Sequence, residues 1–147
     1  MSDQLFRTGE EYVIRSAIQD STLSVSGNLE VSLYDDATDT LADDATPADI
    51  TTEPSGLTRQ SVAFDSNEYT LSLSGGNFQA EFEDQVFDVD ANTESVDSYV
   101  VFVTFNSDVE NATTPEEQLF FSGSLNQSFD LSNITEFVLR GSGIAID

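Results

Sequence analysis

The sequence lacks four residue types that carry much of protein chemistry: cysteine, histidine, lysine and tryptophan do not occur among its 147 residues. Without cysteine there is no disulfide, no thiolate metal site and no cysteine nucleophile. Without histidine there is no Ser-His-Asp triad and no imidazole zinc site. Any chemistry of this chain must therefore use carboxylates, hydroxyls, amides and aromatic rings.

Positive charge is also scarce, because only four arginines oppose 28 acidic residues and the formal net charge is −24. A chain with no basic cluster lacks the usual electrostatic route to nucleic acid or to anionic lipid. No stretch approaches the 18 apolar residues of a membrane span. The first residues lack the basic segment and apolar core of a signal peptide. We therefore expect no nucleic-acid or membrane partner, and synthesis in the cytoplasm.

The acidic residues are spread along the whole chain, and 33 residues are Ser or Thr. Multimolar salt shortens the Debye length to about 3 Å or less, so it largely screens repulsion among such charges. The absence of lysine also removes long apolar stems from the surface. This composition resembles that of proteins from salt-in halophiles, especially haloarchaea and their viruses. We interpret the charge mainly as an adaptation to brine.

The apolar residues favour one folded domain over residues 1–147 rather than an acidic disordered tail. Hydrophobic residues make up 38% of the chain, including 11 Phe, and they lie in short runs throughout it. A helix is predicted over residues 8–19, where Thr8 and Glu11 have the spacing of a capping box. Its buried face is expected to carry Tyr12, Val13, Ala17 and Ile18.

The remainder of the chain has the pattern of β-strands. Apolar and polar residues alternate in Leu29–Leu33, Tyr69–Leu73 and Phe78–Phe82, which predicts strands with one buried face. Residues 99–105 are apolar on both faces, which predicts a central strand. The sequence thus predicts a mainly β fold: an antiparallel β-sandwich of jelly-roll, Ig-like or barrel-like type with one short N-terminal helix.

Two long acidic loops are expected, at residues 35–54 and 106–117. Loops of this length are uncommon unless they bind something or become ordered in an assembly. We expect the first of them to become ordered only against a neighbouring subunit.

Calcium is the metal that the carboxylates first suggest. Asp88, Asp90 and Asn92 have the first spacings of an EF-hand loop. The pattern then fails, because Thr93 replaces the required Gly and Tyr99 replaces the bidentate Glu. No confident metal site or cofactor is therefore predicted, and structural cations remain an open alternative. The weak candidate ligands for such cations are Asp35, Asp36, Asp39, Asp88 and Asp90.

No catalytic residue is predicted either. A carboxylate-based hydrolase needs two acids that face each other across a cleft, and in so acidic a chain no pair stands out. The scarce arginines are more informative. Arg15, Arg59 and Arg140 are candidates for an interface with an acidic neighbouring subunit, and ion pairs within the chain are the alternative.

The order of these features resembles that of small β-rich virion proteins of tailed viruses. The resemblance rests on Gly9–Ile14, on Leu29–Tyr34 followed by an Asp/Thr-rich segment, and on Glu53-Pro-Ser-Gly56 before Arg59. It continues in the apolar run Val96–Thr104 and in Leu119–Gly123, and it spans residues 9–146.

This resemblance implies a non-enzymatic structural subunit of a tailed-virus virion from a halophilic host, assembled in the host cytoplasm. A capsid-bound decoration or turret component is the first expectation, as a homo-oligomer in contact with virion proteins such as the major capsid protein. The alternatives are a tail or baseplate protein, or a cellular carbohydrate- or Ca²⁺-binding β-sandwich module of a haloarchaeon.

Overall fold

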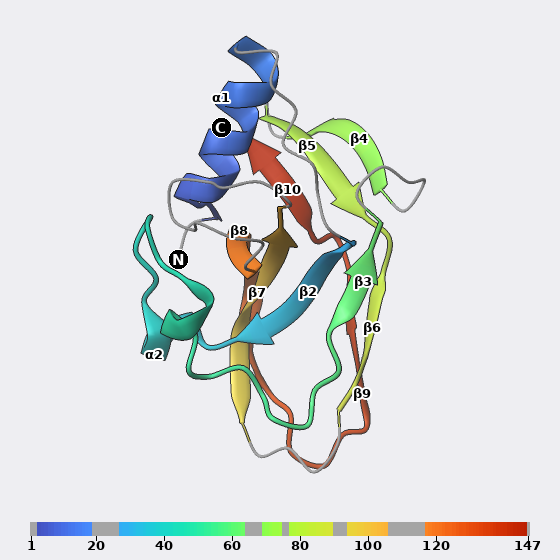
Figure 1. Cartoon of the computed structure of the whole chain (residues 1–147). Helices are drawn as coiled ribbons and strands as arrows, with labels where there is room; N and C mark the ends of the chain where they lie inside the picture. Colours follow the sequence, from blue (N-terminus) through green and yellow to red (C-terminus); the bar gives the residue numbers. More distant parts are fainter. Residues whose placement is uncertain are drawn as a thin grey trace.

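A five-stranded antiparallel sheet forms the centre of the fold in the computed structural model (Figure 1). The structure describes residues 3–18, 27–63, 69–74, 77–89, 94–105 and 117–146. In spatial order the strands are β1 (Gln4–Leu5), β8 (Glu117–Asp130), β7 (Ser95–Thr104), β2 (Leu29–Tyr34) and β3 (Gln60–Val62). β7 lies in the middle and residues 99–103 are buried. The predicted central strand is therefore confirmed.

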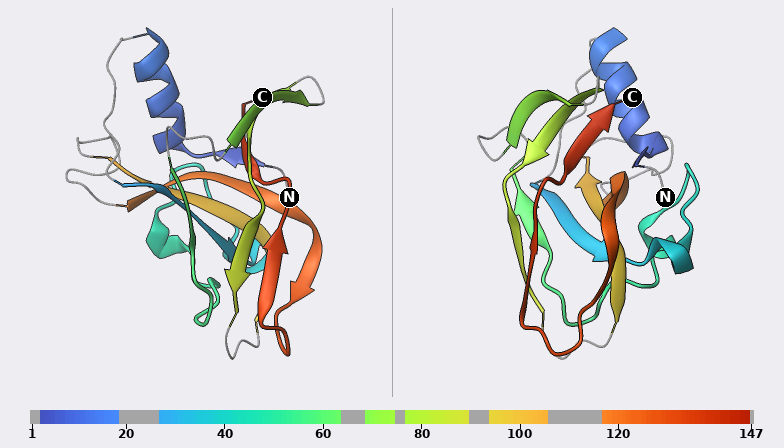
Figure 2. Two further views of the ribbon diagram at one scale, coloured as in Figure 1. Left: turned by 90° about the vertical axis from the view of Figure 1, so that its right-hand side faces the viewer. Right: turned by 180° about the vertical axis from the view of Figure 1, so that it is seen from behind.

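Two smaller antiparallel sheets accompany it. One has the order β10 (Gly143–Ile146), β5 (Asn77–Phe82) and β4 (Tyr69–Ser74), and the other pairs β6 (Gln85–Asp88) with β9 (Glu136–Leu139). β4 and β5 pair antiparallel, from the Tyr69–Phe82 pair to the Ser74–Asn77 pair. A glycine pair such as Gly75-Gly76 predicts a hairpin turn between them, but these two residues lie outside the described residues. The fold is thus mainly β with antiparallel sheets, as predicted. Figure 2 shows the β6–β9 ribbon running alongside the central sheet.

The main hydrophobic core joins these sheets. Val31, Val101 and Phe121 of the central sheet belong to one buried cluster with Phe87 of β6 and Leu139 of β9. The members of this cluster on β2 and on β6 alternate along the strand with other residues, because successive side chains of a strand point to opposite faces. The β6–β9 ribbon is therefore held to the molecule by one face and presents the other face outward.

A second core covers the other face of the central sheet. It contains Tyr34, Phe102 and Leu119, and Ala45 is buried with them. Ala45 belongs to the acidic segment 35–54, which includes the one-turn helix α2 (Asp36–Asp39) and the 3₁₀ turn η1 (Pro47–Asp49). This segment packs on its own sheet, which corrects the expectation that it orders only against a neighbouring subunit. We call residues 35–54 the acidic cover.

The helix α1 (Arg7–Ile18) matches the predicted range to within one residue, but two details of the prediction are wrong. Thr8 lies inside the helix and is buried, so it is not the N-cap. Ala17 is exposed rather than on the buried face. Tyr12 anchors the helix by stacking on Phe105, with 5.7 Å between ring centroids. Among the described residues, no helix combines the length and the apolar character that crossing a membrane requires.

β8 contains both the apolar run Leu119–Phe121 and the later Phe129, which mainly polar residues separate in the sequence. It is a single strand of 14 residues whose pairing with β7 shifts register twice. Such irregularities bend a strand and increase its twist. The predicted loop 106–117 lies outside the described residues except for Glu117, which begins β8.

Candidate functional site

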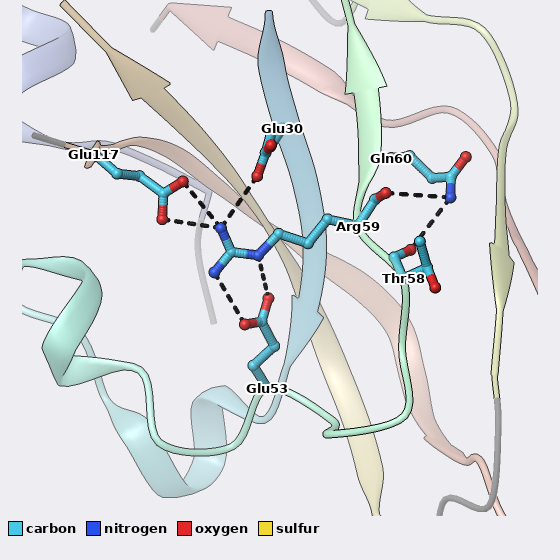
Figure 3. Close-up of polar contacts among 6 residues, drawn as sticks. All are labelled: Glu30, Glu53, Thr58, Arg59, Gln60 and Glu117. Carbon is cyan, nitrogen blue, oxygen red and sulfur yellow. Dashed lines mark hydrogen bonds and ion pairs between the residues drawn. The ribbon is translucent and has the colours of Figure 1, made fainter.

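The most concentrated group of charged side chains in the described residues surrounds Arg59 (Figure 3). Its Nε and NH2 atoms donate to the two carboxylate oxygens of Glu53 at 2.8 and 3.0 Å. Its NH1 atom donates to both oxygens of Glu117, at 2.9 and 3.0 Å, and to Glu30 at 3.2 Å. The guanidinium carbon also lies 3.9 Å from the centroid of the Phe102 ring. We call these five residues the Arg59 cluster.

Each member of the Arg59 cluster is placed by the central sheet or by the chain that leads into it. Glu30 and Phe102 are direct cross-strand partners on β2 and β7. Glu117 is opposite Thr104 at the start of β8. Arg59 immediately precedes β3, which pairs with β2. Strand register therefore brings four separate segments to one guanidinium.

The guanidinium stays charged in this setting. Burial alone would lower the pKa of Arg59, but its hydrogen bonds to Glu53 and Glu117, and their negative charges, outweigh burial and raise that pKa above its ordinary value. A guanidinium whose planar fork meets a carboxylate in two parallel hydrogen bonds is among the stronger charge-assisted contacts. The arrangement ties the end of the acidic cover to the sheet.

No protein-family model, curated protein or solved structure matches this chain. The site is therefore judged from its own geometry.

Asp35 and Asp39 of the acidic cover accept hydrogen bonds from backbone amides and hydroxyls of the same segment. Asp39 accepts hydrogen bonds from the amide groups and hydroxyls of both Thr51 and Thr52. Burial alone would raise the pKa of Asp39, but these hydrogen bonds outweigh it and lower the pKa below its ordinary value. Asp35 accepts from the Ala37 amide and the Thr38 hydroxyl. These contacts close the cover on itself.

The weak candidates for cation binding are not brought together. Asp35, Asp36 and Asp39 share the cover, but Asp36 accepts from the Tyr34 hydroxyl at 3.1 Å while the other two cap nearby backbone. Asp88 lies on β6, and Asp90 is outside the described residues. Within the ranges that the structure describes, no group of three or more Asp or Glu side chains is arranged so that it could hold a metal ion.

The three arginines proposed for an interface all form ion pairs within the chain. Arg15 pairs with Glu11 one helical turn away, at 3.2 Å. Arg140 pairs with Asp84 at 3.1 Å, yet 76% of its side chain remains exposed. By comparison, 29% of the Arg59 side chain is exposed. They lie on different elements, so they form no common surface. Arg140 has the most freedom to contact a second molecule.

Sequence reasoning missed the partners of Arg59. The three glutamates are spread over the chain from position 30 to position 117, and no spacing rule connects them. The only available signal was the rarity of arginine itself. A polar contact near β10 was also missed, because its two partners are far apart in the sequence: the Tyr99 hydroxyl donates to the Gly143 carbonyl at 2.9 Å. Burial raises the pKa of Tyr99 to about 12 although this hydrogen bond opposes the rise.

Proposed function

We propose that this chain is a non-enzymatic structural subunit of the virion of a tailed virus from a halophilic host. Its place is a capsid-bound decoration or turret component, assembled in the host cytoplasm as a homo-oligomer against proteins such as the major capsid protein. The finer fold belongs to the same proposal: the sheets make an antiparallel β-sandwich with jelly-roll, Ig-like or barrel-like connections.

The observation that carries this proposal is that Arg59 is held by three carboxylates of its own chain. Every nitrogen of the guanidinium donates to a carboxylate of the same chain. A substrate carboxylate or phosphate would have to compete with these three carboxylates for the guanidinium. The strongest polar convergence in the described residues thus acts as a structural tie between the acidic cover and the sheet, which suits a framework protein better than a catalyst.

The acidic cover supports the same proposal. Its carboxylates accept hydrogen bonds from the cover's own threonine hydroxyls and amides, and these bonds stabilise one conformation of the segment. A rigid, highly charged β module that tolerates brine fits a particle exposed to saturated salt. The resemblance to small virion proteins adds to this argument.

Mass spectrometry of purified virus particles tests the proposal. The chain should be present in stoichiometric amounts, and its absence from particles would contradict the virion role. Immunogold labelling separates the positions: label on heads supports a decoration or turret component, and label on tails supports the tail or baseplate alternative. Saturable binding of a sugar or Ca²⁺ by a monomer in high salt would instead favour the cellular binding module.

A further inference from the structure

The outward face of the β6–β9 ribbon carries an ordered charge pattern. Strand register pairs Val86 with Val138, and Asp88 with Glu136. The next pair in the other direction is Asp84 with Arg140, joined by the ion pair of 3.1 Å. Side chains alternate along strands, so every second pair shares one face. The Asp84–Arg140 ion pair, one residue beyond the ends of both strands, continues this face. The three pairs on this face are an ion pair, an apolar pair and an acidic pair: Asp84–Arg140, Val86–Val138 and Asp88–Glu136.

This face is open to solvent. Val86 is 42% exposed and Val138 is 36% exposed, although both are large apolar residues. The opposite face of the ribbon is anchored in the core by Phe87 and Leu139. Figure 2, left, shows β6 and β9 side by side on the side of the molecule that faces the viewer. The face thus presents an exposed apolar pair with charged pairs on both sides of it.

The acidic pair, Asp88 and Glu136, forms no ion pair among the described residues. Asp88 and Glu136 lie directly opposite each other, and like charges in that position destabilise a strand pair. The ion pairs found in the described residues use other carboxylates. A cation supplied from outside would relieve this repulsion.

We propose that this face binds the same face of a second copy of the chain, around a two-fold axis that crosses the strands at the Val86–Val138 pair. A two-fold contact is isologous, so each surface must complement itself. This axis places the Arg140 end of one copy over the Asp88 and Glu136 end of the other, at both ends of the contact. The inference rests on the homo-oligomer of the proposed function.

Charge selects this axis over its alternative. A two-fold axis parallel to the strands would place the Asp88–Glu136 pair of one copy over the same pair of the other copy. Four carboxylates would then gather at one end of the contact. The axis across the strands instead gives each Arg140 three carboxylates: its own Asp84, and Asp88 and Glu136 of the other copy. The Arg59 cluster already has this ratio of one guanidinium to three carboxylates, so the fold contains a precedent for it.

The contact is expected to be weak for an isolated pair. Five residue positions per strand span about 14 Å at roughly 3.4 Å per residue. Two strands about 4.8 Å apart make this face about 10 Å wide, so its area is well below the roughly 800 Å² per partner of a standard interface. Association should therefore be concentration-dependent, and it would gain from many copies fixed on one particle.

Sedimentation equilibrium in about 2 M KCl, where long-range repulsion is screened, tests the inference. The wild-type chain should form dimers. Arg140→Glu should weaken dimerisation at least tenfold, because it places four carboxylates at each end. The double variant Arg140→Glu with Glu136→Arg should restore it to within about threefold, because one cation again meets three carboxylates.

Matched controls make the result specific. Arg7→Glu changes the net charge equally, from −24 to −26, at a residue on α1 with ion-pair distances of 3.8 and 3.9 Å. It should leave dimerisation unchanged. Val138→Asp keeps Arg140 and should weaken dimerisation at least tenfold. Circular dichroism in the same buffer verifies that each variant is folded.

Two outcomes would overturn the inference, and they differ in what they say of the proposed function. A dimer that Arg140→Glu and Val138→Asp leave intact would place the contact on another face, and the proposed function would stand. A wild-type chain that stays monomeric at the highest concentrations would remove the homo-oligomer as well. Presence in virus particles is measured separately, so neither outcome decides it.

Discussion

Replacing Arg59 with methionine should be the most destabilising change of a surface charge in this protein. Methionine keeps an unbranched apolar side chain but leaves Glu30, Glu53 and Glu117 without their shared cation, and it removes the guanidinium from the Phe102 ring. Partly exposed ion pairs contribute up to about 1 kcal/mol each, so we assign about that to each of the two doubly bonded glutamates. Glu30 is 44% exposed and adds little. The cation–π contact adds about 0.5–1 kcal/mol.

The expected loss is therefore about 2–3 kcal/mol in the free energy of unfolding. Urea unfolding followed by circular dichroism, in buffered KCl at neutral pH, measures it. With the m-values of small proteins, the unfolding midpoint should fall by roughly 1 M urea or more. Arg59→Lys should lose part of this amount, because an ammonium group lacks the planar fork that meets Glu53.

Arg140→Met is the matched control, since it removes the same charge from an ion pair that is 76% and 54% exposed. It should change the free energy of unfolding by less than about 0.5 kcal/mol, measured at a concentration where the chain is monomeric. Equal losses for Arg59→Met and Arg140→Met would refute the reasoning, because the Arg59 cluster would then contribute no more than an exposed ion pair.

Three further predictions follow from other parts of the fold. Gly143→Ala should destabilise by about 1–3 kcal/mol, because the new methyl group would meet the backbone of Ala80 and Glu81 on β5; thermal melting measures this. The pKa of Asp39 is lowered on folding, so its contribution is present above its ordinary pKa of 3.8 and is lost as the pH falls below it. Asp39→Asn should thus lose less stability than the wild type between neutral pH and pH 3 in urea titrations. Finally, the melting temperature should rise from about 0.2 M to about 2 M KCl as repulsion is screened, and an optimum below about 0.2 M would contradict the halophilic interpretation.

Sequence patterns predicted those parts of the fold that depend on neighbouring residues. Alternation located the strand at Leu29–Leu33, and the two-sided apolar run located β7 at the centre of its sheet. These features could be predicted because the period of a strand is written in its own residues. The pattern located the helix to within one residue but placed its N-cap wrongly at Thr8, because Thr8 is buried by tertiary packing, which a capping pattern does not include.

The Arg59 cluster and the acidic cover could not be predicted in the same way. Their partners meet only through strand register, and Arg59 and Glu117 are 58 residues apart. The cover has the composition of a solvated loop, yet Ala45 is buried against Phe102 and Leu119 by long-range packing. The charge pattern on the β6–β9 ribbon likewise exists only after Asp84 and Arg140, 56 residues apart, are brought together.

The Arg59 cluster also bears on the order of events in folding. Its contacts close chain segments of 6, 29 and 58 residues at a single guanidinium. Long segments are slow to close, because their loop entropy must be overcome before the contact forms. The cluster is therefore complete only after β2 and β8 have docked on β7. A contact that forms late mainly slows unfolding rather than speeding folding. We therefore expect the loss of Arg59 to speed unfolding more than it slows folding.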